Sequence, residues 1–599
     1  DIARIEVMPL AGTEFAADTR GGAILITLRR RRDGGMDGNL QFSTVQSNRI
    51  AGYTPSGRIG IRTGRWTLTA SGSGSFTPVA ESRFTETREQ AGQPLPFAGR
   101  SDSKSRTNYG RGHFSAVFDP TPKHTAGFDI EYTERSTHMP TLSRTTLGQT
   151  QSDSRYRQHM DGNTLTATAN YIWKIDTLGS QFKLIADYTR YTSDGDNSYH
   201  TTTCAPGTLR DSLYESATGS VYDILTADAG LTRKLPHGLT LRAGLRYTRN
   251  DMADKSRYAA QTQGTWLALP EYSYDQHYTE QIGAAYASLE YSAGRWELSA
   301  GLRGEYTSVA SQAFGRSYFG LFPNVSVSRA LNALRTWLLV AQWSRNIERP
   351  AFPALNPARI RISDYSWQSG NPSLRPTYIH RFSLTAVWKY RYTLTVGGNL
   401  HHDLIREIAH RDATAPDAVY IRPENHYTEN HWFVAASVPA KITRWWNLSV
   451  NAVGVMQRIR LNSTDSPATH YLMFADATCS FTLPAGFFAE AVYRAQSRLY
   501  SGNSEVGPRH TLSATVKKQL FGKRLTLFCT LSNITGCDWE FASLTDGMRR
   551  TIDTGQAWSG RLWKVGAAWN FRTGKKFRAR TVESAAETQR KRLVKSTEQ

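Results

Sequence analysis

Residues 239–247 read LTLRAGLRY, and apolar and polar side chains alternate along this stretch. The leucines and Tyr247 fall on one face of an extended chain, whereas Arg242 and Arg246 fall on the other, because successive side chains of a β-strand point to opposite faces. Such a period of two predicts a β-strand with one apolar and one hydrated face.

The same alternation recurs along the chain. Residues 296–303 (WELSAGLR) and 563–571 (WKVGAAWNF) repeat it. The polar faces carry Arg, Glu and Lys, which favours a water-filled lumen over the dry interface between two packed sheets. We therefore expect an all-β chain whose apolar side chains face lipid.

The connections between the predicted strands are short and long in turn. Ten are short turns, at Thr63–Arg65, Pro120–Lys123, Ile175–Gly179, Lys234–Gly238, Ala293–Arg295, Leu331–Leu334, Tyr390–Arg391, Pro439–Arg444, Leu483–Gly486 and Leu520–Lys523. The longer polar segments, which we expect to be loops, include Val79–Asn108, Met139–Gly162, Ser198–Ser220, Lys255–Tyr278, Asn346–Pro376 and Gly536–Gly560. Short periplasmic turns and long external loops are typical of outer-membrane barrels. Ten short turns predict a transmembrane antiparallel β-barrel of about 22 strands over residues 31–571.

The composition is consistent with this fold and argues against other classes. Aromatic residues make up 11% of the 599 residues, as expected for aromatic belts at two membrane interfaces, and no stretch of 18 apolar residues predicts a membrane helix. The net charge is +21, but the basic residues are scattered, so nucleic acid is not an expected partner. The absence of a repeat of fixed length argues against a solenoid or propeller.

Four cysteines, Cys204, Cys479, Cys529 and Cys537, lack the spacing of a metal site. Cys204 and Cys537 fall in predicted loops, where a disulfide between them is compatible with an oxidising compartment. Free thiols are the interpretation that we favour.

Two polar groups in predicted strands are candidate sites. Strand alternation would put His401 and Asp403 on one face and His402 on the other; we favour simple lumen polarity over metal binding. Another inward face carries Glu297, Arg303 and Glu305, for which a solvated ladder of ion pairs is favoured over contact with solute. No nucleophile elbow, phosphate loop or metal-protease helix is present, so we expect no enzyme, no catalytic residue, no metal and no cofactor.

The first 30 residues resemble the end of the plug domain of TonB-dependent receptors. In that family a strand like Ile5-Glu6-Val7 is followed by a Pro-containing turn and by a strand that opens with two glycines, here Gly21 and Gly22. The resemblance implies that residues 1–30 are a plug remnant and that the chain is part of a longer protein.

The segment Asn346–Pro376 resembles a signature of the same family, of the form R-P, L-N-P and G-N-P-x-L-x-P. The matching positions are Arg349, Pro350, Asn356, Pro357, Gly370, Asn371, Pro372 and Pro376. Because prolines fix φ and remove hydrogen-bond donors, the segment should add no barrel strand and should fold back on itself. We expect an ordered extracellular loop.

The resemblance implies an outer-membrane TonB-dependent receptor that takes up an unidentified solute, in the branch that often carries an N-terminal carboxypeptidase-regulatory-like domain. The implied partners are outer-membrane lipid, TonB through an N-terminal part that the chain lacks, the solute, and in some relatives a surface lipoprotein. The alternative is a barrel without transport, acting as a surface scaffold, adhesin or secretion partner.

Residues 572–599 form a basic tail beyond the last predicted strand. An even number of strands returns the chain to its starting side, so the tail should lie on the periplasmic side. Its polar, basic composition favours disorder below the barrel over contact with the anionic head groups of the inner leaflet.

Overall fold

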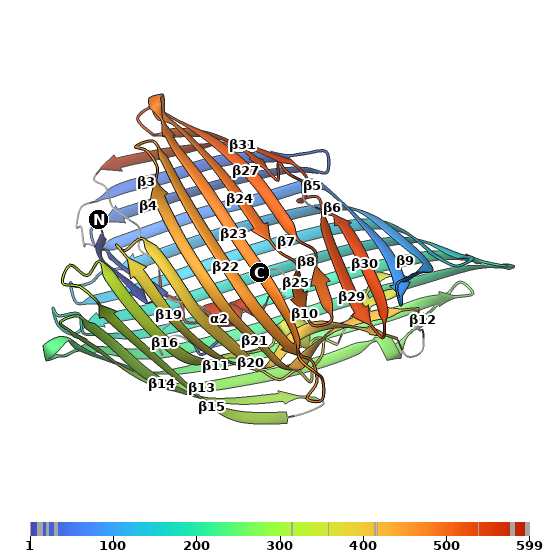
Figure 1. Ribbon diagram of the computed structural model, residues 1–599, viewed down its shortest axis with the longest axis horizontal. Coiled ribbons are helices and arrows are strands. Elements are labelled where there is room, and N and C mark those ends of the chain that lie inside the picture. Colours follow the sequence, from blue (N-terminus) through green and yellow to red (C-terminus); the bar gives the residue numbers. More distant parts are fainter. Residues whose placement is uncertain are drawn as a thin grey trace.

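The fold was analysed in a computed structural model, which describes residues 2–8, 16–18, 23–28, 34–312, 315–357, 359–412, 415, 417–536, 538–574 and 582–593. The chain forms a closed antiparallel β-barrel of 22 strands (Figure 1). The predicted all-β transmembrane barrel is therefore confirmed. The described residues contain no helix long and apolar enough to cross a membrane.

The barrel strands are β3 (Gly35–Gln46), β4 (Ile50–Thr63), β5 (Trp66–Gln90), β6 (Gln93–Phe118), β7 (His124–Leu147), β8 (Thr150–Lys174), β9 (Gln181–Ala205), β10 (Thr208–Lys234), β11 (Leu239–Thr262), β13 (Tyr274–Ala293), β14 (Trp296–Ser311), β15 (Gly315–Ala330), β16 (Trp337–Glu348), β19 (Thr377–Trp388), β20 (Tyr392–Arg411), β21 (Val419–Lys441), β22 (Trp446–Arg460), β23 (Ala468–Leu483), β24 (Phe487–Gln496), β27 (Arg509–Leu520), β28 (Leu525–Ser532) and β31 (Leu562–Gly574). Each pairs with the next in this order. The ring closes between β3 and β31, in a register that runs from Gly35 opposite Gly574 to Gln46 opposite Trp563.

The two faces of the strands differ as the sequence predicted. In β11, Leu245 is 65% exposed, whereas Thr240 and Arg242 are buried inside the barrel. Tryptophans beside the short turns are also exposed, as an aromatic belt at a membrane interface requires: Trp66, Trp173, Trp296, Trp337 and Trp388.

All ten predicted short turns join neighbouring barrel strands. The prediction for the opposite end is wrong in two respects. The connection between β3 and β4 is short as well, at residues 47–49. Segments 79–108, 139–162, 198–220 and 255–278 are mainly strand, because β5 to β11 continue as hairpins of up to 27 residues per strand.

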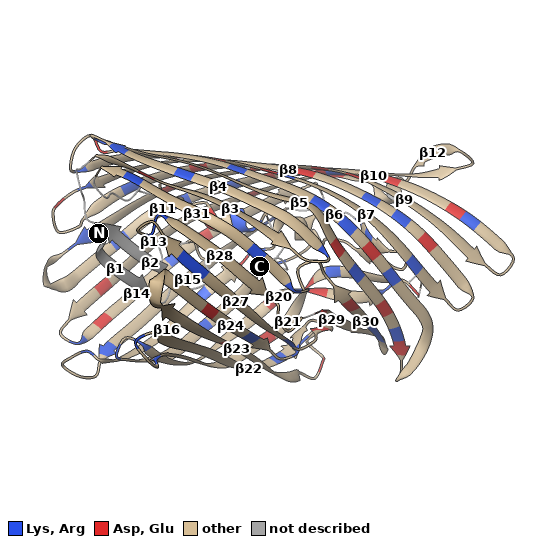
Figure 2. Cartoon of the chain, turned by 90° about the horizontal axis from the view of Figure 1, so that it is seen from above, with Lys and Arg blue, Asp and Glu red and all other residues tan. Residues whose placement is uncertain are grey.

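The hairpins end in tight turns with left-handed backbone. Between β5 and β6, Ala91 and Gly92 have φ of +50° and +77°, as a two-residue hairpin requires. Figure 1 shows these strands extending far past the shorter strands of the second half of the chain. Acidic and basic residues line their protruding ends (Figure 2), which explains why the apolar alternation disappears there although strand pairing continues.

A further hairpin, β29 (Trp539–Thr545) and β30 (Met548–Gly555), lies in the last long connection. It pairs with the protruding part of β5 through β30, and with the short strand β26 (Ser504–Val506) through β29. Two more short strands, β12 (Thr265–Ala268) and β25 (Leu499–Ser501), pair with β11 and β26. Among the described residues, 3-10 turns occupy Pro236–Gly238, Pro270–Tyr272 and Pro484–Gly486.

The described part of the basic tail does not lie below the barrel. Residues 582–593, which include the helix α2 (Glu587–Lys591), lie inside the lumen and contact its wall and an inward loop (Figure 1). The prediction of a disordered tail is wrong for these residues, because Gln589 and Arg592 find buried polar partners. Strand β31 also reaches Gly574, three residues beyond the predicted end of the barrel at Phe571.

Candidate functional site in the barrel lumen

The proline-rich segment 349–376 folds into the lumen and contacts the inner wall of the barrel. β16 and β19 pair along their whole length, from Trp337 opposite Trp388 to Glu348 opposite Thr377, so the segment leaves the barrel at the end opposite the short turns. It then folds inward with the helix α1 (Phe352–Leu355) and the hairpin of β17 (Ile360–Ser363) and β18 (Ser366–Gln368). The loop adds no strand to the barrel wall, as expected, but it turns into the barrel instead of standing outside.

An apolar contact holds the loop against the wall. Phe352, Leu355 and Leu374 are at most 3% exposed and form one buried cluster with side chains of the strands β10, β11, β13 and β14. The wall residues of this cluster are Tyr222, Ile224, Met252, Tyr278 and Val309. These contacts bury apolar surface inside a mainly polar lumen and thereby stabilise the inward position.

The motif glycine and asparagine fold the loop on itself. The Gly370 N–H donates to the Asn356 carbonyl at 2.9 Å, and the Asn371 N–H donates to the Ala354 carbonyl at 2.7 Å. The Asn371 side-chain amide also donates to the Pro423 carbonyl at 3.0 Å, which ties the loop to β21. The first half of the motif therefore contacts the second half directly.

The other motif residues lie at the two ends of the loop and in its turns. Arg349 is buried and donates to Glu305 Oε2 at 2.7 Å and to Thr307 Oγ1 at 3.1 Å. Pro350 supplies a carbonyl to the tail at 3.0 Å. Pro376 is buried where β19 begins, whereas Pro357 and Pro372 are half-buried.

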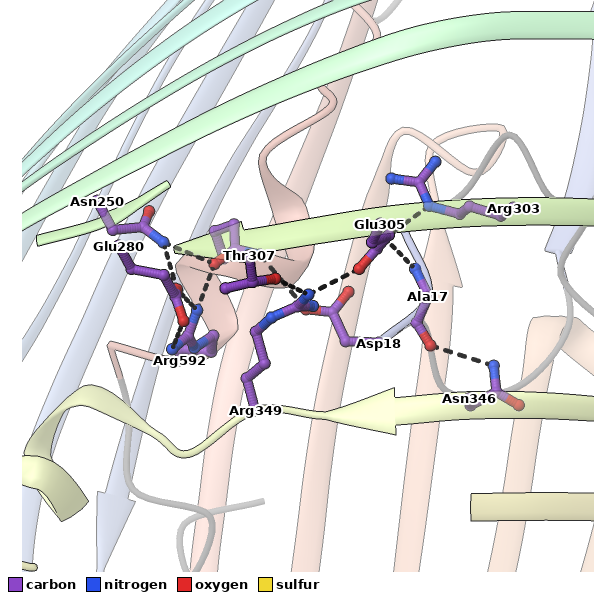
Figure 3. Close-up of polar contacts among 11 residues, drawn as sticks. Ala17, Asp18, Asn250, Glu280, Arg303, Glu305, Thr307, Asn346, Arg349 and Arg592 are labelled. Carbon is purple, nitrogen blue, oxygen red and sulfur yellow. Dashed lines mark hydrogen bonds and ion pairs between the residues drawn. The ribbon is translucent and has the colours of Figure 1, made fainter. Parts of the chain in front are cut away.

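Charged side chains from several segments meet beside Arg349 (Figure 3). Arg303 Nε donates to Glu305 Oε1 at 2.6 Å, so Glu305 binds two guanidiniums and is 2% exposed. Glu280 of β13 pairs with Arg592 of the tail and accepts a hydrogen bond from Asn250 Nδ2 at 2.9 Å. Such pairs tolerate burial because each charge has a partner and hydrogen bonds.

The N-terminal segment reaches the same place. The Ala17 N–H donates to Glu305 Oε1 at 3.3 Å, and the Ala17 carbonyl accepts from Asn346 Nδ2 at 3.2 Å (Figure 3). Gln589 of the tail donates to Asp18 Oδ2 at 3.4 Å. We call the group of Glu280, Arg303, Glu305, Arg349 and Arg592 the lumen cluster. This cluster and its neighbours connect the barrel wall, the inward loop, residues 16–18 and the tail.

The tip of the inward loop contacts β8 of the barrel wall and the strand β30 of the last long connection. Asp364 accepts hydrogen bonds from Ser154 Oγ at 2.7 Å and Tyr156 OH at 2.8 Å, and it pairs with Arg361. Ser366 accepts from Arg550 at 2.9 Å. Burial raises the pKa of the intervening Tyr365, which keeps this phenol protonated and able to donate.

A cavity of about 540 Å³ lies between the loop, the wall of β19 and β20, and the tail. Its lining carries both signs of charge, from Arg381, Arg406, Glu348 and Glu407, among others. The volume falls in the range of small-molecule binding sites. This part of the lumen can hold a polar solute.

The polar pair predicted at β20 is separated. His401 lines the cavity and donates through Nδ1 to the Glu429 carbonyl at 2.7 Å. Asp403 has a φ of +57°, which interrupts strand alternation, and its carboxylate pairs with Arg375 of the loop at 2.7 Å. His402 is exposed and contacts the ring of Tyr427. Among the described residues, no cluster of three or more His, Cys, Asp or Glu is placed to hold a metal ion.

The prediction of a solvated ladder of ion pairs on β14 is wrong for two of the three residues. Arg303 and Glu305 are both 2% exposed and belong to the lumen cluster. Glu297 lies beside a short turn, where its exposed side chain is 3.8 Å from Arg335. The loop and the tail cover the first two residues, which a strand taken alone could not show.

The plug-end residues are only partly described. Ile5, Glu6 and Val7 lie in β1 (Ile2–Met8), opposite Ile26, Leu25 and Ile24 of β2 (Ala23–Leu28), in a separate two-stranded sheet. Gly21 and Gly22 lie outside the described residues.

Three of the cysteines are described, and all three are free thiols. Cys204 is exposed in the strand β9 instead of a loop, while Cys479 and Cys529 lie in barrel strands as predicted. Cys537, the other member of the predicted pair, lies outside the described residues.

Sequence reasoning missed Glu280, Asn250, Asp364 and Arg592. One signal was available for Glu280: it interrupts an inward series in β13 that is otherwise uncharged, Tyr278, Ile282, Ala284 and Tyr286. A lone acid at such a position needs a cation from elsewhere in the fold. Nothing in the sequence indicated that the tail supplies it.

The comparisons with known proteins agree with this geometry. The siderophore receptor PirA from Pseudomonas aeruginosa superimposes with a TM-score of 0.57 at 14% identity, over 95% of this chain and 87% of that one. A mutant of the ferric enterobactin receptor PfeA from the same organism gives 0.59 at 14%, over 95% and 85%. The copper transporter OprC gives 0.59 at 11%, over 93% and 85%.

At these identities the likeness to the solved structures establishes the fold alone. Comparison with curated protein sequences gave no match. The outer membrane protein beta-barrel family matches residues 173–566, which is most of the chain. The chain therefore belongs to the outer membrane protein beta-barrel family and is a protein of the outer membrane.

Proposed function

We propose that this chain is the barrel of a TonB-dependent receptor that imports a solute through its lumen. The observation that carries the proposal is how the lumen is closed. A barrel of 22 strands encloses a wide passage, and here separate segments fill it through side-chain contacts and short backbone contacts. Moving these segments would open a passage without unpairing neighbouring barrel strands.

The cavity beside the inward loop supports a polar solute as the cargo. Arg381 and Arg406 on the wall are balanced by Glu348 and Glu407, and His401 adds an imidazole ring. The similar structures include receptors for siderophores and a transporter for copper. An anionic chelate, a glycan and a peptide all remain compatible with this lining.

The energy would come from TonB, as in the family that the sequence resembles. We assign residues 1–30 to the end of the plug and residues 31–571 to the barrel, and we place the TonB contact in a part of the protein before this chain. A surface lipoprotein would be a further partner above the lumen. The proposal includes no catalytic step.

An uptake experiment tests the proposal. Cells with and without the full gene, and with and without TonB, are supplied in turn with a radiolabelled iron chelate, a copper chelate, an oligosaccharide mixture and a peptide mixture. We expect one class to accumulate only when both the gene and TonB are present. Accumulation that does not depend on TonB would contradict the proposal.

A pair of variants on one strand connects uptake to the cavity. Arg381→Ala removes a cation from the cavity wall and should lower uptake about tenfold, the loss expected for one charge-assisted hydrogen bond. Leu384→Ala, on the lipid-facing side of β19 where Leu384 is 48% exposed, should leave uptake unchanged. Equal uptake by both variants would show that transport does not depend on this cavity.

A barrel that acts as a surface scaffold, adhesin or secretion partner is the second candidate. It is favoured by the hairpins of β5 to β11, which protrude well beyond the shorter strands (Figures 1 and 2). Binding of a macromolecule to whole cells, lost when these hairpins are shortened and unaffected by TonB, would support this candidate over import.

A further inference from the structure

The tail lies inside the lumen along the part of the wall formed by β9 to β13. At one end, Glu583 pairs with Lys183 at 2.6 Å, and the Ala585 N–H donates to Asp187 Oδ2 at 2.8 Å, both on β9. At the other end, Arg592 reaches β13 and the inward loop. Between them, Gln589 Oε1 accepts from Asn250 Nδ2 of β11 at 3.2 Å.

The Arg592 guanidinium lies in a site that matches its shape. Its Nε donates to the Pro350 carbonyl at 3.0 Å, and its two Nη atoms contact the Glu280 carboxylate. The Phe352 ring covers its face, with the guanidinium carbon 4.2 Å from the ring centroid. A planar cation fits such a site, because its edge donates hydrogen bonds while its face contacts the aromatic ring. An ammonium ion has no flat face and cannot make both kinds of contact in this way.

The site is built deeply into the lumen. Glu280 is 2% exposed, Asn250 is 0% exposed and Arg592 itself is 6% exposed. A buried carboxylate needs a cation close by, and the ion pair that the structure gives Glu280 is with Arg592. Glu305, by contrast, already pairs with Arg303 and Arg349 and does not need the tail.

The same residue fixes the inward loop. The Phe352 N–H donates to the Arg592 carbonyl at 2.8 Å, and Leu593 packs against the buried cluster that contains Phe352, Leu355 and Leu374. The tail therefore contacts the loop through a side chain, a backbone carbonyl and an apolar residue. Releasing the segment around Arg592 would remove the ring contact and the backbone hydrogen bond that it makes with Phe352 of α1, and the hydrogen bond to the Pro350 carbonyl.

We propose that Glu280, Asn250, Phe352 and the Pro350 carbonyl form a guanidinium-binding site in the lumen, whose ligand is an arginine of a peptide segment. Arg592 occupies this site, so that residues 582–593 act as a removable strap that holds the inward loop closed. This inference goes beyond the proposed import function, because it requires neither a solute nor TonB.

Ion conductance of the purified chain in planar lipid bilayers tests the strap. Deletion of residues 582–599 should raise the conductance, because the loop loses its support and the lumen loses a segment. Arg592→Ala should raise it as well, whereas Arg592→Lys should give an intermediate value because it keeps the charge without the planar edge and face. The matched control is Arg590→Ala, since Arg590 donates to Ser584 Oγ of the tail itself at 3.0 Å and does not line the cavity.

A synthetic peptide of residues 582–599, added to the deletion variant, tests the site itself. We expect the peptide to restore the low conductance, and the same peptide carrying R592A to need about a tenfold higher concentration. Glu280→Gln in the barrel should weaken the effect of the unmodified peptide to a similar extent. Free arginine should compete with the unmodified peptide.

Each variant is first checked for a heat-dependent shift in gel mobility, so that misfolded barrels are set aside. If the deletion variant does not fold, the comparison of Arg592→Ala with Arg592→Lys in the full chain decides the question. Unchanged conductance in the folded variants, or equal block by both peptides, would overturn the strap and leave the import proposal standing.

Discussion

Gly370 occupies a position in the inward loop that no larger residue can fill. A Cβ at this position would lie 2.1 Å from the Asn356 carbonyl oxygen and 2.8 Å from that of Ala354. Both are backbone atoms and cannot rotate away. Gly370→Ala should therefore destabilise the folded loop by about 1–3 kcal/mol, as overpacking does elsewhere, and release it from the lumen.

Accessibility of a reporter cysteine beside Gly370 measures this effect. Ser369→Cys lines the cavity and should react slowly with an impermeant thiol reagent in the parent barrel and faster with Gly370→Ala added. Gly454→Ala in β22 is the control, because its Cβ would meet nothing within 4 Å. Equal labelling rates in the two double variants would show that the loop tolerates the added methyl group.

At the scale of single residues, the sequence identified the motif residues but did not predict whether their loop turns into the barrel or out of it. The prolines and Gly370 indicate a loop that folds on itself, and this local property depends on neighbouring residues only. Whether the loop turns outward or inward depends on Tyr222 and Glu305, more than 40 positions away along the chain. No spacing in the sequence contains that information.

At the scale of the elements, the long hairpins show where the alternation of apolar and polar residues no longer identifies a strand. Inside the membrane one face of a strand meets lipid and the other the lumen, so apolar alternation is required. Beyond it both faces of β5 to β10 meet water, and Ser, Thr and charged residues occupy both sides. The backbone ladder does not need apolar side chains, so strands continue where the sequence pattern resembles a loop.

Hydrogen exchange measures whether these outer segments are strands or loops. Amides in 79–90 and 93–108 should stay protected for hours in the folded barrel, because they belong to the ladder between β5 and β6. The turn at residues 461–467, between β22 and β23, supplies the comparison and should exchange within seconds. Exchange of both regions at the same fast rate would restore the loop interpretation.

For the whole molecule, the decisive contact is the one between the first and last barrel strands. The sequence predicted about 22 strands because the short turns could be counted, and closure follows from the need to pair every edge within lipid. The contents of the lumen could not be predicted in this way, since loop 349–376 and residues 582–593 carry no periodic pattern. Only their contacts with distant strands fix them.

Closure makes a prediction about the stability of the purified protein in detergent. The pairing of β3 with β31 leaves no free edge, so the unboiled barrel should stay folded in sodium dodecyl sulfate and run faster than the boiled chain. Truncation after Arg561 removes β31 and leaves the edges of β3 and β28 unpaired within lipid, which costs several kcal/mol per exposed group and should abolish the fast form. Deletion of residues 582–599 keeps β31 and should preserve the fast form, since the strap contributes to closing the lumen and not to closing the sheet. If this shorter deletion also abolished the fast form, the tail would be part of the barrel's structural core, and the distinction between a removable strap and a closed wall would be wrong.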